Sequence, residues 1–293
     1  PADVADAEAV WIAADEAVAR FGRIDAWVNN AMATIVAPAE TVCPDEFRRV
    51  TEVTYLGQVH GTLAALRHMR RAGGGTIVQV GSALAYRSIP LQAAFCAAKA
   101  AVRGFTDSLR SELIREASPV RLTMVQLPAV DTPQFDWARS RMAKRLQPVP
   151  PIHAPEVAAE AIFRAAHEAP RELWVGLPTM QAILGTMAAP GWLDRMMANR
   201  AWDGQMTEER SPLSRPDNLF SPPPGDPGAH GRFGARSRRQ APSLSSGIVR
   251  GAVAALGIGL IAGAGMAAGA ALSSSRGRRG DARFRGILPP PQR

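Results

Sequence analysis

The sequence has few of the residues on which disulfide-linked and metal-binding proteins depend. Its 293 residues include only two cysteines, Cys43 and Cys96, which are too few for a disulfide framework and are typical of a reducing compartment. The five histidines show no metal-ligand spacing with one another or with the cysteines, so we predict no metal site. No basic segment followed by an apolar run lies near the first residue, so nothing there resembles a secretory signal. These shortages favour a cytoplasmic domain built around an ordinary hydrophobic core.

Acidic residues are scarce in the last part of the chain. Residues 1–210 hold 22 lysines and arginines against 23 aspartates and glutamates, whereas residues 211–293 hold 12 against 3. The net charge of +8 therefore belongs to the C-terminal part, and the rest is close to neutral. We infer that the main domain does not bind nucleic acid and that the C-terminal part has an anionic partner, such as a membrane surface.

What the sequence does contain is an alternation of helical and strand-like patterns up to about residue 177. Helical apolar spacing, with proline at two helix starts, predicts helices at residues 6–21, 44–71, 96–116 and from Pro155 onward. Short apolar or β-branched runs predict buried strands at residues 24–29, 76–80 and 120–126 and a last edge strand at 173–176. This alternation predicts an α/β fold with a doubly wound parallel sheet, which binds ligands at the carboxyl ends of its strands.

Four motifs accompany these elements. In chain order they are Asp3-Val4, Asn29-Asn30-Ala31, Ser82 with Lys99, and the segment LPAVDT at residues 127–132. Their order and spacing over residues 1 to about 180 resemble the short-chain dehydrogenase/reductase family of oxidoreductases. The resemblance implies a Rossmann-like fold, NAD or NADP as cofactor, a small-molecule alcohol or carbonyl substrate, and a homodimer or homotetramer built on the two longest predicted helices.

The resemblance implies catalytic roles for Ser82 and Lys99. In the family, the serine hydroxyl hydrogen-bonds the substrate oxygen and steadies its developing charge. The lysine holds the nicotinamide ribose and lowers the pKa of a tyrosine that gives or takes the proton. The residues alone leave a second interpretation of Ser82, which is a turn serine at the end of a strand.

Two of the family's catalytic positions hold other residues. The tyrosine position, four residues before Lys99, holds Phe95, and the position of a helix asparagine that supports a proton relay holds Thr54. Losing a general acid typically lowers a rate by about 10²–10⁴. Tyr86 has the wrong spacing to replace it, and we interpret it as a core or pocket-wall residue. We therefore predict an oxidoreductase with impaired or altered proton transfer, with a non-catalytic, membrane-tethered binding or scaffold relative as the alternative.

The resemblance also implies a set of cofactor-binding residues. They are Asp3, Val4, Asn29, Asn30, Ala31, Lys99, Pro128, Ala129, Val130 and Thr132. Met32 and Ala129 stand where the family motifs have glycine. The glycine-rich turn that binds the cofactor pyrophosphate in the family is not found before Asp3. We expect that the sequence begins inside the domain, and a remnant that has lost this segment is the alternative.

The C-terminal part predicts a different organisation. We expect the short-chain dehydrogenase-like domain at residues 1–205, a linker rich in proline, glycine and arginine at 206–247, an apolar helix at 248–272 and a basic tail at 273–293. Residues 251–272 carry no charge. At about 1.5 Å per residue they match a bilayer core of about 30 Å. Their small residues at four-residue spacing also fit a soluble glycine-zipper helix or a low-complexity tail.

Deletion of residues 247–293 tests the membrane interpretation. We expect the full-length protein in the membrane fraction of expressing cells and the shortened protein in the soluble fraction, because the deletion removes the apolar segment and most of its flanking arginines. Fractionation followed by immunoblotting measures both. Full-length protein recovered in the soluble fraction would contradict the prediction.

Overall fold

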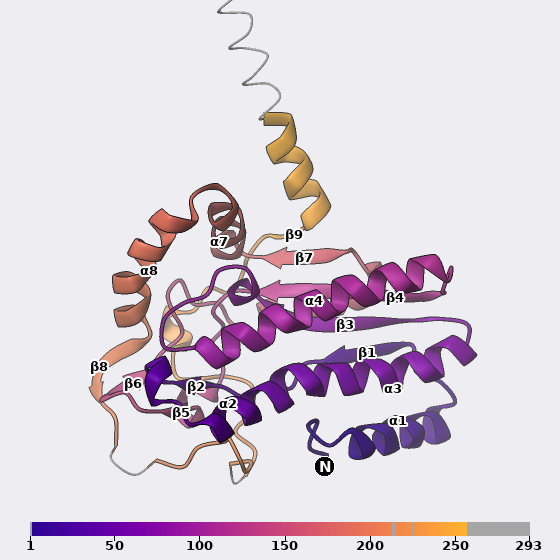
Figure 1. The fold of residues 1–293 in the computed structure, drawn as a ribbon, viewed down its shortest axis with the longest axis horizontal. Coiled ribbons are helices and arrows are strands. Elements are labelled where there is room, and N and C mark those ends of the chain that lie inside the picture. Colours follow the sequence, from indigo (N-terminus) through magenta and orange to yellow (C-terminus); the bar gives the residue numbers. More distant parts are fainter. Residues whose placement is uncertain (1, 213–214, 224, 257–293) are drawn as a thin grey trace, which may run out of the picture. The chain divides into compact units, whose positions relative to one another are not determined.

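Five strands form the central sheet of the protein, seen in a computed structural model that describes residues 2–212, 215–223 and 225–256 (Figure 1). The strand order is β1-β3-β4-β7-β9, and the first four strands run parallel while β9 is antiparallel to β7. Their bounds are Ala26–Asn29 for β1, Gly75–Ser82 for β3, Val120–Leu127 for β4, Glu172–Val175 for β7 and Ser243–Ser245 for β9. The parallel sheet confirms the predicted α/β fold class.

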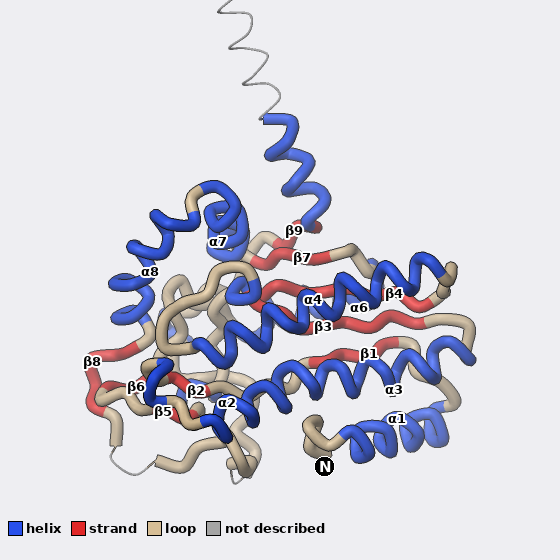
Figure 2. The backbone as a smooth tube through the Cα atoms, viewed as in Figure 1, coloured by secondary structure: helices blue, strands red, loops and turns tan. Residues whose placement is uncertain are grey.

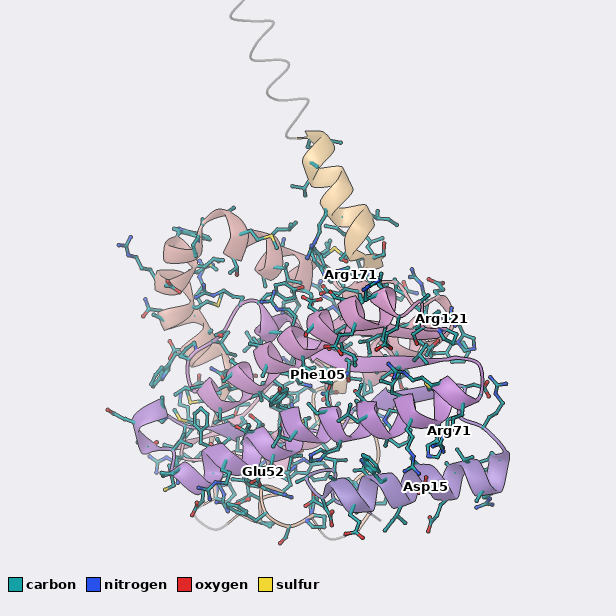
Figure 3. The ribbon with its side chains drawn as sticks, turned by 45° about the vertical axis from the view of Figure 1, so that its right-hand side comes forward. Asp15, Glu52, Arg71, Phe105, Arg121 and Arg171 are labelled. Atoms are coloured by element: carbon teal, nitrogen blue, oxygen red, sulfur yellow. The ribbon has the colours of Figure 1, made fainter. Side chains whose placement is uncertain are left out.

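Helices pack on both faces of this sheet (Figure 2). One face carries α1, α3 and α4, and the other carries α6. The helices are α1 Ala7–Phe21, α2 Pro44–Thr51, α3 Gly57–Arg71, α4 Ala93–Arg115, α5 Gln134–Trp137, α6 Pro155–Glu168, α7 Leu177–Ala188 and α8 Pro190–Gly204, with short helical turns at Ala39–Thr41, Ala83–Ala85 and Gly234–Arg236. In Figure 3 the labelled side chains Asp15, Arg71 and Phe105 mark α1, α3 and α4.

Alternate side chains of the central strands enter two different cores, because successive strand residues point to opposite faces of a sheet. Ile77 of β3 and Leu122 of β4 pack against α1, α3 and α4. Val78 and Val125 pack on the opposite side, against α6 and β7. All four side chains are buried. The continuous apolar runs in the sequence therefore reflect strands that are covered on both faces.

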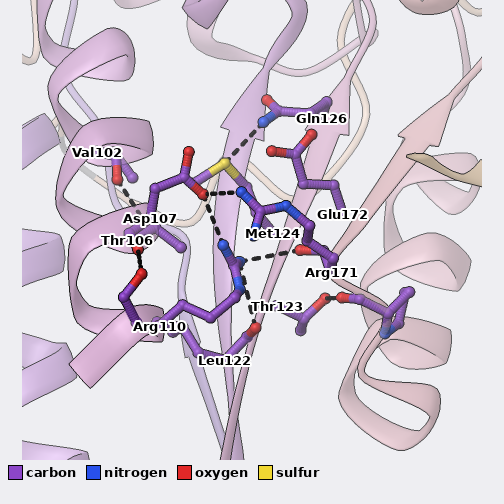
Figure 4. A network of polar contacts seen from close by, with 12 residues as sticks. Val102, Thr106, Asp107, Arg110, Leu122, Thr123, Met124, Gln126, Arg171 and Glu172 are labelled. Atoms are coloured by element: carbon purple, nitrogen blue, oxygen red, sulfur yellow. Dashed lines mark hydrogen bonds and ion pairs between the residues drawn. The ribbon is translucent and has the colours of Figure 1, made fainter. Parts of the chain in front are cut away.

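A polar network ties α4 to the neighbouring strands (Figure 4). The Asp107 carboxylate accepts hydrogen bonds from Arg110 at 2.7 Å and from Arg171 at 2.6 Å. Arg110 also donates to the Arg171 carbonyl at 3.1 Å, next to the start of β7. Because two guanidinium groups share one carboxylate, the network fixes the middle of α4 over the sheet.

The structure differs from the predicted helices at two places. Residues 44–71 are helical throughout, but a π-helical turn over Glu52–Leu56 separates α2 from α3. Helix α4 begins at Ala93 rather than at residue 96, because the Cys96 amide already donates to the Gln92 carbonyl at 2.9 Å. Phe95 therefore lies on the first turn of α4, one turn before Lys99.

Two small sheets lie beyond the carboxyl ends of the central strands (Figure 1). One pairs β2 (Ile35–Val36) with β5 (Arg139–Ser140) in parallel. The other pairs β6 (Lys144–Leu146) with β8 (Met206–Arg210) in antiparallel orientation. The first pair connects the chain after β1 with the chain after β4, and the second connects the chain after β4 with the chain after β7, beside the edge of the sheet where a ligand is expected.

The part predicted to be a linker packs on the domain. The first compact unit runs to Ser246, well past the expected boundary at residue 205. Leu219 and Phe233, two apolar residues in a segment otherwise rich in proline, glycine and arginine, are buried with exposed fractions of 0% and 6%. Leu219 packs in a core cluster and the Phe233 ring packs against Phe135. Strand β9 pairs with β7, so β7 is not the edge strand that the sequence predicted.

The second compact unit covers Gly247–Arg293. Residues 247–256 are helical. Most of the predicted apolar helix at 248–272, and all of the predicted tail at 273–293, lie outside the described residues. Among the helices that the structure does describe, none combines the length and the apolar character needed to cross a bilayer.

Gly61 and Gly104 provide a matched test of the packing. A Cβ atom at Gly61 would lie 2.2 Å from the Asn29 side-chain oxygen and 2.7 Å from the Trp27 ring nitrogen, whereas one at Gly104 meets nothing within 4 Å. We expect Gly61→Ala to destabilise the protein by about 1–3 kcal/mol through overpacking. Gly104→Ala should stabilise α4 by about 0.5–1 kcal/mol. Urea denaturation measures both, and equal effects would contradict the packing described.

Candidate functional site

The carboxyl ends of β1, β3 and β4 bring three of the predicted motifs to one edge of the sheet. Asn29 ends β1 and pairs with Gln79 of β3. Ser82 ends β3 and pairs with Leu127, the last residue of β4. Because these neighbouring strands are parallel, the serine lies beside the segment that continues into Pro128. This edge is where open α/β sheets bind their ligands.

Ser82 is the last residue of β3, and its side chain is half-buried. Its hydroxyl oxygen accepts a hydrogen bond from the Leu84 amide at 3.1 Å and so caps the short helical turn Ala83–Ala85. The hydroxyl proton is not used by this contact. The same side chain can therefore fulfil the turn role and still donate a hydrogen bond to a substrate oxygen.

Lys99 lies on the inner side of α4 with only 3% of its surface exposed. Its ammonium donates to the Val80 carbonyl at 2.6 Å, which ties the lysine to the strand that carries Ser82. Burial lowers the pKa of Lys99 from 10.5 to about 7, because the charged form loses its hydration. An ammonium has three donor hydrogens, so this group retains the capacity to bind further acceptors.

Phe95 covers the lysine from the preceding turn of α4. Its ring centroid lies 5.6 Å from the Lys99 ammonium nitrogen, and its exposed fraction is 8%. A ring at this distance attracts the cation through its negative face. Phenylalanine provides no proton that could pass to a substrate. The ring at the position four residues before the lysine therefore packs beside the ammonium but cannot act as an acid or a base.

Thr54 lies in the π-helical turn and is fully buried. Its hydroxyl donates to the Ala33 carbonyl at 2.8 Å and accepts from the Ala33 amide at 3.0 Å. These two bonds hold the chain that follows Asn29-Asn30-Ala31. In this structure the residue at the predicted relay position fixes the backbone beside the site.

Asn29 is also used by the fold. Its amide nitrogen donates to Thr62 and Gln79, both at 2.9 Å, and its oxygen accepts from the Trp27 ring nitrogen at 2.8 Å. Asn30 and Ala31 are exposed. The motif thus divides into one buried residue that holds the strand and two residues that face the outside of the sheet edge.

Asp3 and Val4 lie against α2 and α3. The Asp3 carboxylate accepts from the Ala5 amide at 3.0 Å and from the Arg49 guanidinium at 2.6 Å. Partial burial alone would raise the pKa of Asp3, but the hydrogen bonds from Ala5 and Arg49 outweigh it and the pKa is lowered. Val4 packs closely on Gly57, and its carbonyl lies 3.0 Å from the His60 ring nitrogen. Asp3 and Val4, which the sequence predicts to contact the adenine, are therefore held in place by α2 and α3.

The loop after β4 holds the other predicted cofactor residues. Pro128, Ala129, Val130 and Thr132 are half-buried. The backbone of this loop is ordered by His153, whose amide donates to the Ala129 carbonyl at 2.9 Å and whose carbonyl accepts from the Asp131 amide at 2.8 Å.

Tyr86 lies in a separate polar cluster. Its hydroxyl contacts both oxygens of the buried Glu172 carboxylate, at 2.7 and 2.8 Å, and Arg103 lies over its ring at 4.3 Å. Burial and the neighbouring Glu172 charge raise the pKa of Tyr86 to about 12. These contacts bind its hydroxyl to Glu172, and the core or pocket-wall interpretation of this tyrosine stays a prediction.

Two features of the site were missed by the sequence reasoning. Asp131 lies within the predicted motif but was assigned no role, and it is 99% buried with its carboxylate facing the chain near Phe233. The packing of the C-terminal segment was also missed. The isolated apolar residues Leu219 and Phe233, in an otherwise polar stretch, were the signal that could have indicated it.

The residues at the sheet edge fit the nicotinamide half of NAD or NADP. The buried Lys99 ammonium has spare donors suited to ribose hydroxyls, and the half-buried loop at residues 128–132 lies beside Ser82. In the described part of the chain no group of three or more histidine, cysteine, aspartate or glutamate side chains is arranged to bind a metal ion.

Comparisons with known proteins agree with this geometry. The sequence model of the family described as short chain dehydrogenase matches residues 1–143. The chain is 35% identical over 215 residues to the uncharacterized oxidoreductase YxnA of Bacillus subtilis, covering 72% of this chain and 60% of that protein. It is 36% identical over 172 residues to cis-4-hydroxycyclohexanecarboxylate dehydrogenase of Sinomonas cyclohexanicum, covering 57% of this chain and 68% of that protein. The chain thus spans about 60% of the length of the Bacillus relative.

A solved structure supports the fold. A short-chain dehydrogenase from Streptomyces avermitilis superposes with a TM-score of 0.54 and 25% identity, covering 69% of this chain and 80% of that one.

The depressed pKa of Lys99 makes stability depend on pH. Between about pH 7 and pH 10.5 the unfolded chain binds the proton that the folded chain has lost, so unfolding becomes harder as pH rises through this window. Below pH 7 the cost of the buried charge is fully present. We expect Lys99→Met to be more stable than the wild type at pH 7, by roughly 3–5 kcal/mol at most, and this difference to shrink towards pH 10. Urea denaturation across this range tests it, and a constant difference would contradict it.

Proposed function

The chain belongs to the short-chain dehydrogenase family of oxidoreductases, and we propose that it transfers hydride between a nicotinamide cofactor, NAD or NADP, and the alcohol or carbonyl group of a small molecule. The observation that carries the proposal is the pairing of Ser82 and Lys99 through one strand. Lys99 binds the Val80 carbonyl at 2.6 Å, two residues before Ser82 on β3. The dehydrogenase from Sinomonas supports an alcohol or carbonyl substrate, since its name describes a hydroxy-acid substrate.

Each residue of the site has a proposed part in this reaction. When bound, the nicotinamide supplies or takes the hydride. Ser82 donates a hydrogen bond to the substrate oxygen and stabilises its developing negative charge. Lys99 binds the ribose hydroxyls. Asn30 and Ala31 at the end of β1, together with the loop at residues 128–132, enclose the cofactor. Asp3 and Val4 contact the adenine, and Asn29 and Thr54 support the site through the backbone.

Proton transfer is the step for which this chain is poorly equipped. Reduction of a carbonyl consumes one hydride from the cofactor and one proton, and Phe95 has no proton to give. The proton for the substrate oxygen then comes from water or from a weaker donor than a tyrosine paired with lysine. We therefore propose slow turnover, since loss of a general acid lowers rates by about 10²–10⁴.

A non-catalytic relative is the second candidate. It is favoured by the contacts that already occupy several site residues: Arg49 binds the Asp3 carboxylate, and the Phe95 ring covers the Lys99 ammonium. Such a protein keeps the fold and a ligand pocket without turnover. The two candidates differ in whether the natural protein, with Phe95, turns over at all.

We extend the proposal to assembly and location. Helices α3 and α4 expose Leu63 at 42% and Ile114 at 73%, which supports a homodimer or homotetramer built on these helices. The catalytic domain, residues 1–205 with the packed C-terminal segment, works in the cytoplasm. Residues 251–272 tether it to a membrane.

Phe95→Tyr tests the proposed function. We expect the wild type to turn over alcohols or carbonyls slowly with NAD or NADP, and Phe95→Tyr to be faster by about 10²–10⁴, because it restores a proton donor beside Lys99. Absorbance at the reduced-nicotinamide band measures both. Phe105→Tyr, which adds a hydroxyl to a half-buried ring ten residues later on α4, is the control and should leave turnover unchanged.

Three outcomes separate the candidates. Turnover by both proteins, faster in Phe95→Tyr, supports an enzyme with altered proton transfer. Turnover by Phe95→Tyr alone identifies the natural protein as the non-catalytic relative. If both proteins fold, as circular dichroism reports, and neither turns over with either cofactor, the enzyme proposal is wrong.

A further inference from the structure

The last part of the first compact unit packs against the loop of the candidate site. Two stretches of it, residues 215–219 and 231–245, which we call the C-terminal clasp, bind the loop at residues 128–132 and helix α5. The clasp is part of the same compact unit as the site. Its far end is anchored on the domain by β9, which pairs with β7, and by Arg238, whose amide donates to the Ile152 carbonyl at 2.9 Å.

The clasp contacts the loop through Asp131. The Phe233 amide donates to the Asp131 carboxylate at 3.1 Å, and the Gly231 amide donates to the Asp131 carbonyl at 3.2 Å. The approach is so close that a Cβ atom at Gly231 would lie 2.3 Å from the carboxylate oxygen and 2.8 Å from the Thr132 carbonyl oxygen. Asp131 is 1% exposed, so these backbone contacts replace the water that a carboxylate would otherwise bind.

The clasp also contacts three of the four residues of α5. The Phe233 ring meets the Phe135 ring edge to face, with centroids 6.4 Å apart, and Arg232 pairs with Asp136 at 2.9 Å. At the C-terminal end of α5 the Asn218 amide donates to the Trp137 carbonyl at 3.0 Å. A helix of four residues has almost no stability of its own, so its position depends on these partners.

The clasp is fixed in turn to β2, α2 and α4. Leu219 is fully buried among Val50, Ala94 and Ile35. Its carbonyl accepts from Arg49 at 3.0 Å. Thus the clasp connects the loop after β4 with the chain after β1, which are the two sides of the candidate site.

We propose that the C-terminal clasp holds the loop at residues 128–132 and α5 in the shape that receives the nicotinamide and the substrate, and that Asp131 is the positioning residue through which it acts. This inference rests on the proposed function, because that function assigns the loop to the cofactor. Asp131 touches neither the reacting atoms nor the cofactor. Its bonds to the clasp hold the neighbouring residues Ala129, Val130 and Thr132 in one conformation.

Gly231→Ala tests the inference, with Gly234→Ala as the matched control. A Cβ atom at Gly231 collides with Asp131 and Thr132, whereas one at Gly234 lies 4.0 Å from its nearest neighbour, the Asp131 carboxylate. In the full-length protein, hydrogen exchange followed by mass spectrometry reports the amides of Asp131, Thr132 and His153. We expect exchange there to accelerate on the order of 10-fold in Gly231→Ala and to stay unchanged in Gly234→Ala. Equal exchange in the two variants overturns the inference.

A second variant covers the case in which Gly231→Ala does not fold. Asp131→Asn keeps the size of the side chain but removes the charge that strengthens the bond from the Phe233 amide. We expect it to accelerate exchange at Thr132 and His153 in the same direction, by a smaller factor. Exchange identical to that of the wild type overturns the inference even where the glycine variant is lost.

Cofactor binding separates this inference from the proposed function. Titration with NADH and NADPH, followed by tryptophan fluorescence, should show affinity weakened on the order of 10-fold in Gly231→Ala and within twofold of the wild type in Gly234→Ala. If the wild type binds neither dinucleotide, the proposed function fails, while the exchange experiment still decides whether the clasp orders the loop. If exchange accelerates but affinity is unchanged, the positioning role is wrong.

Discussion

The parallel ladder between β3 and β4 is the interaction on which the site depends. Eight consecutive residues pair from Gly75 with Val120 to Ser82 with Leu127. Strand β1 is shorter and its last pair joins Asn29 to Gln79. Val80 therefore lies one residue beyond the end of β1, and its carbonyl is available to accept hydrogen bonds from Lys99 and from the Gln58 side chain. Because β1 ends before β3 does, the Val80 carbonyl of β3 is left to bind Lys99.

Much of the fold was readable from the sequence because it depends on local patterns. The apolar runs at β3 and β4 and the helical spacing of α1, with Asp6 before it and Gly22 after it, are signals that single segments carry. The positions of Ser82 and Lys99 followed from motif spacing. Their placement at the end of β3 and on the inner side of α4 is what those patterns predict.

The remainder depends on contacts between distant segments. Leu219 is buried against residues more than a hundred positions earlier in the chain, so its isolated apolar side chain could signal burial but not the partners that cover it. A stretch rich in proline, glycine and arginine has the composition of a disordered linker, yet single apolar residues such as Phe233 are enough to fix it to a surface that fits them. Asp131 was missed for the same reason, since its partner is Phe233.

The π-helical turn at Glu52–Leu56 has a consequence for how this region tolerates change. A helix advances about 100° per residue, so the wider turn sets the rotational phase of α3 relative to α2. Thr54 faces Ala33 within the turn, and Gly57 directly after it faces Val4. Loss of one residue here would rotate α3 by about a quarter of a circle, and Thr54 and Gly57 would no longer meet both neighbours. Substitutions can be absorbed along this helix, but its length across the turn is fixed.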